Sequence, residues 1–222
     1  MSFYQVSLMS FSYPKSNNIF NEVSFKLDKN ERIGFFGPNG SGKTTMAKLM
    51  MGILKPTGGE ILLEGKPVSK MGLARIGQRV GYVFQNPSKQ LFAPTVWEQV
   101  AFGLSMGKEG ALEGCKPDER VNYWLDFFEL SDASWQFPHY LSRGQKQRLV
   151  LAQVLARGAD FFFMDEPTVG IDRLRLKKLD QCLEAVKDSG RGYIIISHDM
   201  DFLRRHTERL IFFAGDGTVR EL

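Results

Sequence analysis

A glycine-rich stretch carries the clearest chemistry in the sequence. Residues 37–45 read Gly-Pro-Asn-Gly-Ser-Gly-Lys-Thr-Thr, which fits the phosphate-binding pattern G-x-x-x-x-G-K-[ST]. Glycines let the main chain approach a ligand closely, and successive N–H groups then form a concavity that suits an anion. The Lys43 ammonium would reach the terminal phosphates, and the Thr44 hydroxyl would reach Mg²⁺. The residues expected to bind a nucleotide here are Asn39, Gly40, Ser41, Gly42, Lys43, Thr44 and Thr45.

The segments on either side of this stretch support the same interpretation. Residues 32–36 read as a short buried strand, and residues 43–51 read as a helix. The positive N-terminal end of that helix would face the same anion. A glycine-rich turn that fits the pattern by chance is the alternative, and the order of strand, loop and helix argues against it.

A second group of chemically active residues follows an apolar run. Residues 161–164 read Phe-Phe-Phe-Met, as expected of a parallel strand buried on both faces, and Asp165 and Glu166 follow at once. Asp165 would be held to Mg²⁺ through the shell of the metal, and Glu166 would act on the attacking water as a general base. Alone, two acids after a strand could equally begin an ordinary turn.

The residues 141–145, Leu-Ser-Arg-Gly-Gln, precede a helix. Ser142 and Gln145 have the spacing of a capping box, so one interpretation is that they only start the helix. The functional interpretation is that this helix start presents N–H groups and a hydroxyl to a phosphate. The two interpretations are compatible.

The remaining chain indicates how these residues are positioned. Residues 1–30 alternate in the manner of antiparallel strands, whereas later apolar strands alternate with helical segments, which is typical of a parallel α/β sheet. Between them, residues 86–150 read as a mostly helical insert, with a Gly-rich surface loop expected over 103–117.

Composition excludes several classes of protein. The 222 residues carry a net charge of +4, and no basic stripe gathers on one face, so we expect no nucleic-acid partner. Only two cysteines occur, far apart, so a disulfide framework is not expected and a reducing compartment fits. No apolar run approaches the roughly 18 residues that span a bilayer, and no signal-peptide pattern is present. We therefore expect a protein that does not cross the membrane but could dock on a membrane protein.

Taken in order, these motifs resemble a known family. The phosphate loop, Gln85, residues 141–145, the run Asp165-Glu166-Pro167-Thr168 and His198 together look like the ATPase subunit of an ATP-binding-cassette (ABC) transporter. The resemblance covers nearly the whole chain. It implies one ABC ATPase domain over 1–222, with a P-loop NTPase (RecA-like) parallel-sheet core, an N-terminal antiparallel β subdomain and the helical subdomain at 86–150. It also implies a Mg²⁺-dependent ATPase coupled to transport.

The resemblance assigns roles to further residues. Tyr13 stands where the family stacks an aromatic ring on adenine, with Phe11 as a weaker candidate. Gln85 would contact Mg²⁺ and the attacking water, and His198 would contact the γ-phosphate. Asp172 would lie in the loop that joins the two ATP sites of a dimer. The signature that closes over the nucleotide of the opposite chain would comprise Ser142, Arg143, Gly144 and Gln145.

A narrower resemblance concerns residues 85–96, which look like the corresponding loop of energy-coupling-factor importers of vitamins and transition-metal ions. In that group, a pair of ATPases at the cytoplasmic face of the cell membrane drives a transmembrane coupling protein plus a small substrate-binding membrane protein. Residues 91–97 would then line the groove that receives coupling helices. Alternatively, Leu91, Phe92, Val96 and Trp97 form the core of the helical subdomain.

Two features depart from the usual pattern. Arg143 stands where the signature usually has a second small residue, and it would either weaken the site or alter its contact with the phosphate. This leads to the hypothesis that the partner is a different ATPase chain and that the two sites are unequal, with a second copy of this chain as the alternative partner. The chain also stops soon after its last expected strand, which weakens the case for a stable isolated dimer.

Besides a transporter motor, which could serve an energy-coupling-factor importer or another ABC importer or exporter, two other functions are alternatives. A soluble ABC ATPase acting on nucleic acid or ribosomes would commonly have two cassettes or a long insert. A regulatory subunit that does not hydrolyse ATP would lack catalytic residues, whereas Lys43, Gln85, Glu166 and His198 are all present.

Overall fold

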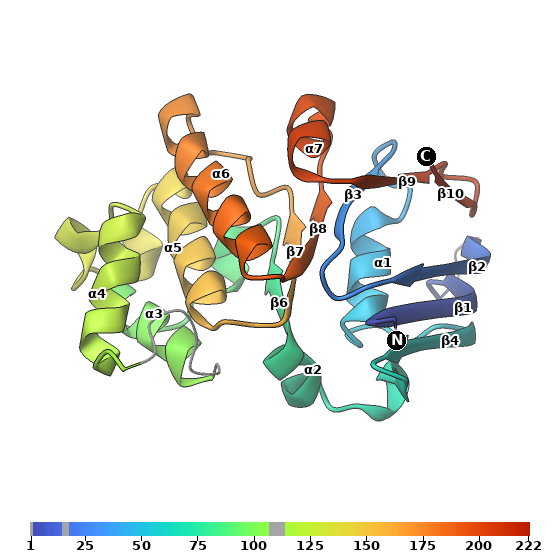
Figure 1. Ribbon diagram of the computed structural model, residues 1–222, viewed down its shortest axis with the longest axis horizontal. Coiled ribbons are helices and arrows are strands. Elements are labelled where there is room, and N and C mark those ends of the chain that lie inside the picture. Colours follow the sequence, from blue (N-terminus) through green and yellow to red (C-terminus); the bar gives the residue numbers. More distant parts are fainter. Residues whose placement is uncertain (1, 15–17, 107–113) are drawn as a thin grey trace.

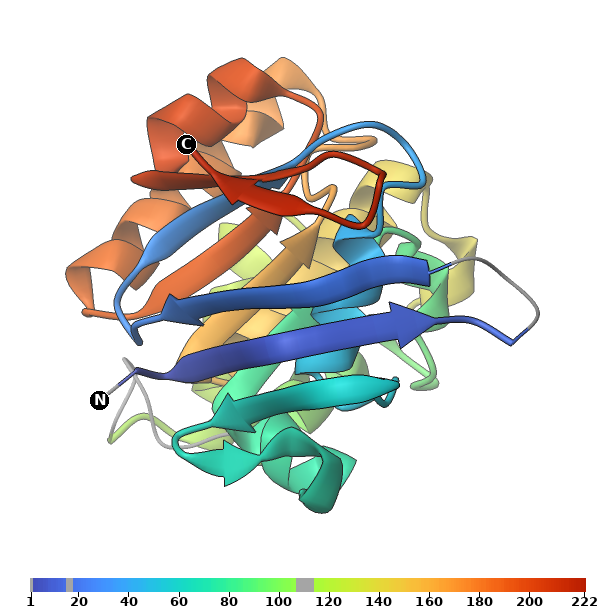
Figure 2. The ribbon, with the colours of Figure 1, turned by 90° about the vertical axis from the view of Figure 1, so that its right-hand side faces the viewer.

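The computed structural model describes residues 2–14, 18–106 and 114–222. A four-stranded antiparallel sheet is built mainly from the N-terminal part of the chain, as the alternating pattern predicted (Figure 2). Its strand order is β2-β1-β4-β5. The strands are β1 (Tyr4–Ser12), β2 (Asn18–Leu27), β4 (Gly58–Leu63) and β5 (Lys66–Pro67).

A second sheet has six strands in the order β10-β9-β3-β8-β7-β6. Its strands are β3 (Arg32–Phe36), β6 (Val80–Val83), β7 (Phe161–Asp165), β8 (Gly192–Ile196), β9 (Arg209–Phe213) and β10 (Val219–Glu221). Strands β6, β7, β8, β3 and β9 pair in parallel, as predicted. The short β10 pairs antiparallel with β9, and it was not predicted because three residues of mixed polarity carry no periodic signal.

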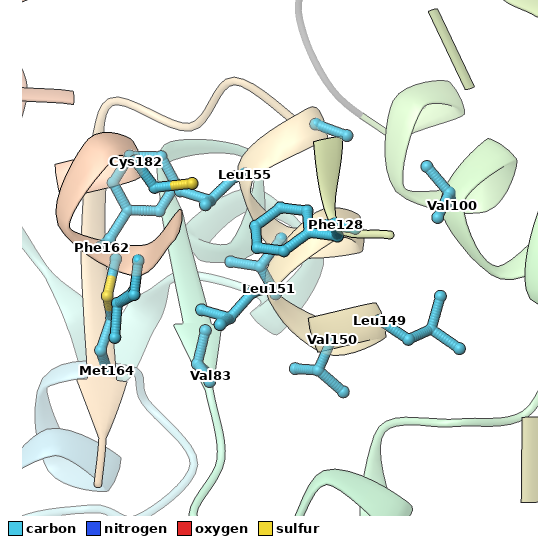
Figure 3. Packing of buried hydrophobic residues seen from close by; sticks show 14 of the residues in the cluster. Val83, Val100, Phe128, Leu149, Val150, Leu151, Leu155, Phe162, Met164 and Cys182 are labelled. Atoms are coloured by element: carbon cyan, nitrogen blue, oxygen red, sulfur yellow. The ribbon is translucent and has the colours of Figure 1, made fainter. Parts of the chain in front are cut away.

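The two faces of the parallel sheet pack against two different hydrophobic clusters. Along β7, Phe161 and Phe163 pack in a cluster with helix α1 (Lys43–Met50) and the antiparallel sheet. Phe162 and Met164 belong to the other cluster, where Phe162 lies near Leu155 of α5 (Arg143–Ala156) and Cys182 of α6 (Arg173–Asp188) (Figure 3). A strand buried on both faces reads as a continuous apolar run, which explains the sequence Phe-Phe-Phe-Met.

The remaining helices pack around the two sheets and around α5 (Figure 1). They are α2 (Leu73–Arg79), α3 (Val96–Ser105), α4 (Pro117–Phe127) and α7 (Met200–His206), with the short 3₁₀ turns η1 (Val68–Lys70), η2 (Pro87–Lys89), η3 (Ser131–Ala133) and η4 (Pro138–Tyr140). Helices α3 and α4 lie beside α5, far from the antiparallel sheet. The loop expected over 103–117 is shorter at its start, since α3 continues to Ser105, and its residues 107–113 lie outside the described part of the chain.

The segment before α3 contributes to the core of the helical layer, which is one of the two roles considered from the sequence. Leu91 and Val96 are buried, and Trp97 packs against the same core, so these residues belong to the helical layer. Phe92 is 59% exposed and lies outside that core. One buried side chain fixes this segment: the Gln99 amide oxygen accepts from the backbone N–H groups of Phe92 (3.0 Å) and Ala93 (2.9 Å).

Replacing Gln99 with methionine should destabilise the protein, because it leaves the buried backbone N–H of Ala93 and the partly buried N–H of Phe92 without an acceptor. We expect the free energy of unfolding in urea to fall by about 2–4 kcal/mol. Gln181→Met on the exposed face of α6 is the matched control and should change it little. An equal effect of both substitutions would show that the Gln99 hydrogen bonds do not hold the segment.

Candidate functional site

The glycine-rich loop connects β3 to α1, as the order of strand, loop and helix predicted. Gly37 and Gly42 have positive φ angles of 142° and 100°. A Cβ at Gly37 would lie 2.2 Å from the carbonyl oxygen of Phe213, and one at Gly42 would lie 2.6 Å from the ring of Phe20. Only glycine therefore fits at these two positions, and the loop is held close to the sheet behind it.

Lys43 closes over this loop. Its ammonium donates to the carbonyl oxygens of Gly37 and Pro38, both at 2.8 Å. Burial lowers the pKa of Lys43, while the nearby carboxylates of Glu166 and Asp165 act in the opposite direction. The cation therefore lies within the field of the two acids at the end of β7.

Asp165 ends β7 and is buried. It accepts a 2.7 Å hydrogen bond from the Thr44 hydroxyl, and the Tyr82 hydroxyl lies 3.5 Å from the same oxygen. Burial raises the pKa of Asp165, and the hydrogen bond from Thr44 is the largest opposing influence. Two motifs that are 121 residues apart in the chain thus meet at the edge of the sheet.

Glu166 adopts a left-handed backbone conformation, with φ of 51°, while its N–H donates to the carbonyl oxygen of Ile196 at 2.8 Å. A non-glycine residue in this region costs of order 1–3 kcal/mol and is characteristic of active sites. The Glu166 carboxylate lies 3.4 Å from Nε2 of His198. Burial raises the pKa of Glu166, and the His198 imidazole lowers it in part.

These groups share one cavity of about 350 Å³. It is lined by Tyr13, Ile19, Asn39, Gly40, Gly42, Lys43, Thr44, Thr45, Gln85, Asp165, Glu166, Ile196 and His198. The predicted residues Tyr13, Gln85 and His198 are therefore gathered with the phosphate loop. Ile19, Ile196 and the underlying Tyr82 were not predicted, since apolar residues within strands give no functional signal.

Two predicted residues lie elsewhere. Ser41 does not line the cavity: its side chain is buried, and its hydroxyl has no hydrogen-bond partner among the described residues. Phe11 is also buried, so it cannot offer a face to a ligand. Its ring instead packs edge-on against Tyr13 at 5.0 Å, and the Tyr13 hydroxyl lies 3.3 Å from the Thr45 hydroxyl. Phe11 is therefore corrected from a stacking candidate to a support for Tyr13.

Three of the four predicted signature residues line a separate cavity of about 390 Å³, together with residues around the start of α6. Its lining comprises Ser142, Gly144, Gln145, Arg148, Gly170, Ile171, Asp172 and Arg175. Ser142 and Gln145 form the predicted capping box at the start of α5. Asp172 caps α6 by accepting from the N–H of Arg175 at 3.0 Å. None of the described residues lines both this cavity and the one at the phosphate loop.

Arg143 does not line the signature cavity. Its aliphatic stem lies against Gly170, where a Cβ would be 3.4 Å from Cγ of Arg143. It lines a further depression with Lys146 and residues 85–88. The side chain that departs from the usual signature therefore points toward the Gln85 segment of the same chain.

The donor set fits Mg²⁺ bound together with phosphate oxygens. Thr44, Gln85 and Asp165 offer hydroxyl, amide and carboxylate oxygens to one cavity, and Mg²⁺ prefers oxygen ligands. Within the described ranges, no group of three or more His, Cys, Asp or Glu side chains could hold a metal alone. In the same ranges, no helix is both long and apolar enough to cross a bilayer.

Comparison with known proteins agrees with this geometry. A family model described as "ABC transporter" matches residues 20–169. The energy-coupling factor transporter ATP-binding protein EcfA of Methanocaldococcus jannaschii is 36% identical over 214 residues, which cover 94% of this chain and 74% of that protein. In two further relatives, the chain covers only 33% and 35% of the relative's length.

Two solved structures extend the agreement to the fold. The ATP-binding cassette MJ0796, solved as a dimer in a post-hydrolysis state with ADP and phosphate, has a TM-score of 0.85 at 26% identity and covers 99% of this chain and 97% of its own. The protein cbiO1 of Clostridium perfringens, part of the ABC transporter complex cbiONQ, has a TM-score of 0.79 at 28% identity over 99% of this chain and 87% of its own. The chain therefore has the α/β fold of an ABC cassette and belongs to the ABC transporter family, as an ATP-binding subunit that hydrolyses ATP to drive transport.

Proposed function

We propose that this chain is the motor subunit of an energy-coupling-factor importer for a vitamin or a transition-metal ion. The observation that carries this proposal is the similarity to EcfA and to cbiO1 over nearly the whole chain. Residues 85–96, which resemble the corresponding loop of the energy-coupling-factor importers, support the proposal as well. We treat 1–222 as one ABC ATPase domain with its helical subdomain at roughly 86–150.

The chain would work as one half of a head-to-tail ATPase pair. The phosphate loop and the signature line different cavities of one chain, so an ATP bound at the first needs the signature of a second chain to cover it. ATP would then favour the closed pair, since a ligand stabilises the state that makes more contacts with it. The dimeric structure of MJ0796 supports this arrangement.

Within each site, residues divide into those that bind and those that act on water. The phosphate loop and Lys43 would bind the phosphates, and Tyr13 would stack on the adenine from the rim of the cavity. Thr44, Asp165 and Gln85 would hold Mg²⁺, which neutralises charge on the phosphates when it is bound. Glu166 would take a proton from the attacking water, and His198 would orient the Glu166 carboxylate and contact the γ-phosphate.

A second surface suits a membrane partner at the cytoplasmic face of the cell membrane, namely a transmembrane coupling protein that works with a small substrate-binding membrane protein. A groove of about 160 Å³ lies between β6 and the helices α3 and α5. At its edge, the exposed rings of Phe92 and Phe102 pack edge-on with centroids 4.8 Å apart. Exposed aromatic side chains beside a groove are typical of an interaction site.

Substituting Glu166 with glutamine should separate binding from turnover. The amide keeps the size of the side chain but cannot accept the proton, so we expect ATP binding to persist and steady-state hydrolysis to fall by about 100-fold or more. The measurement is phosphate release by the purified complex, alongside binding of a fluorescent ATP analogue. Normal hydrolysis by this variant would remove Glu166 from the catalytic role.

Replacing Asp165 with asparagine should lower the rate of ATP hydrolysis and raise the stability of the fold. Because burial raises the pKa of Asp165 above its ordinary value of 3.8, its contribution to stability is complete below that value and is lost as the pH rises through the folded pKa. Asparagine carries no charge, so the variant does not lose this stability as the pH rises. We expect a higher melting temperature at pH 8 without nucleotide or metal, with a smaller gain at about pH 3, below the ordinary pKa of 3.8, and Mg²⁺-dependent hydrolysis reduced by about 100-fold or more. An equal gain at both pH values would contradict the assigned cost of the buried charge.

Arg143→Gly tests whether the two sites of the pair are unequal. If the arginine weakens the site that this signature covers, a glycine should raise the hydrolysis rate of the assembled complex. Lys177→Gly in α6 is the control for the cost of a glycine in a helix. An unchanged rate with Arg143→Gly would remove the support for unequal sites.

A further inference from the structure

We propose that a cavity between α4, α5 and α6 binds a small aromatic carboxylate, which forms ion pairs with Arg120 and Arg191. The cavity has a volume of about 210 Å³. None of its described lining residues lines the cavity at the phosphate loop or the cavity at the signature. A ligand bound there would therefore not compete with ATP for any of these residues.

The apolar part of the cavity suits an aromatic ring. Helix α4 contributes the rings of Tyr123, Trp124 and Phe127, whose centroids lie 5.5, 6.2 and 6.3 Å apart. The buried side chains of Leu155 and Cys182 line the cavity from α5 and α6 (Figure 3). An apolar cavity of about 150 Å³ is large enough for benzene. A volume of about 210 Å³ therefore suits one ring with a short side chain.

The charge at this cavity is unbalanced. Arg120 of α4 and Arg191, which precedes β8, line the cavity, whereas no Asp or Glu does so among the described residues. The Nε atom of Arg120 is buried and has no hydrogen-bond partner in the described part of the chain. A partly buried guanidinium without an anion is unfavourable, and a carboxylate matches the parallel N–H groups of a guanidinium. The two arginines therefore select a ligand that carries a carboxylate.

Arg191 is held in place by neutral groups. Its Nε donates to the Ser189 hydroxyl at 2.7 Å, and its guanidinium lies over the ring of Phe162, 5.7 Å from the centroid. Burial lowers the pKa of Arg191, and the charge of Asp160 acts in the opposite direction. Asp160 itself pairs with two other cations, each at 2.9 Å. The position of the Arg191 guanidinium is thus fixed by contacts that leave its charge to be neutralised by a ligand.

A ligand with one ring and one carboxylate complements both parts of the cavity. The ring would lie against the aromatic side chains of α4, and the carboxylate would lie between the two guanidinium groups. Such a ligand would contact α4, α5 and α6 at once. Because it would bind the folded chain and not the unfolded one, it would also raise the melting temperature.

The test is a calorimetric titration of the purified chain with hydrocinnamate and with its neutral amide, hydrocinnamamide, which has the same ring and side chain. We expect one carboxylate to bind per chain and the amide to bind roughly 10-fold or more weakly, because it cannot form the ion pairs. Arg120→Met and Arg191→Met should each weaken binding of hydrocinnamate by roughly 10-fold or more. The control Arg204→Met, on the exposed face of α7, should bind it as the wild type does.

A substitution that fills the cavity locates the site. Ala185 of α6 lines the cavity and is exposed, so Ala185→Phe should abolish binding of hydrocinnamate. Lys177→Phe adds the same ring to α6 outside the cavity and should bind as the wild type does. All variants should bind a fluorescent ATP analogue equally, which shows that their fold is intact. No saturable binding by the wild type, equal binding of the amide, or unchanged binding by Ala185→Phe would each overturn the proposed site.

Discussion

The buried carboxylate of Asp165 is the constraint on which the nucleotide site depends. It lies at the end of a strand that is apolar on both faces, and its principal hydrogen-bond donor is the Thr44 hydroxyl at the start of α1. Burying a carboxylate is unfavourable, as the raised pKa of Asp165 indicates. The cavity beside it also contains the Lys43 ammonium, and we propose that a cation with its phosphates would offset the buried charge there.

The separation of the phosphate-loop cavity from the signature cavity explains why such a chain would work with a partner. The cavity with the phosphate loop contains the acids and His198, whereas the signature and Asp172 line another cavity of the same molecule. Asp172 and Ser142 are both helix caps, so the residues that would face the opposite chain are fixed by local hydrogen bonds before any partner binds. A preformed surface of this kind loses little conformational entropy when the pair closes.

The sequence was most informative where backbone geometry limits the choice of residue. Gly37 and Gly42 are required by positive φ angles and by close neighbours, so the loop, its strand and its helix could be predicted from the residue pattern. The apolar run of β7 likewise predicted a doubly buried strand. Side-chain direction could not be predicted in this way. Ser41 turns into the protein, Phe11 lies under Tyr13, and Arg143 packs on Gly170, because long-range packing decides each of these orientations.

The central claim is that ATP joins this chain to a second ATPase chain through the signature. The most direct measurement places a photoreactive phenylalanine analogue at Tyr140, which is 83% exposed two residues before the signature, in the Glu166→Gln background. After illumination of the assembled complex, mass spectrometry identifies the peptide that has been joined. The account predicts an ATP-dependent crosslink to the region of the phosphate loop in a second ATPase chain. A crosslink to the phosphate loop of the same chain, or one that forms equally without ATP, would contradict it.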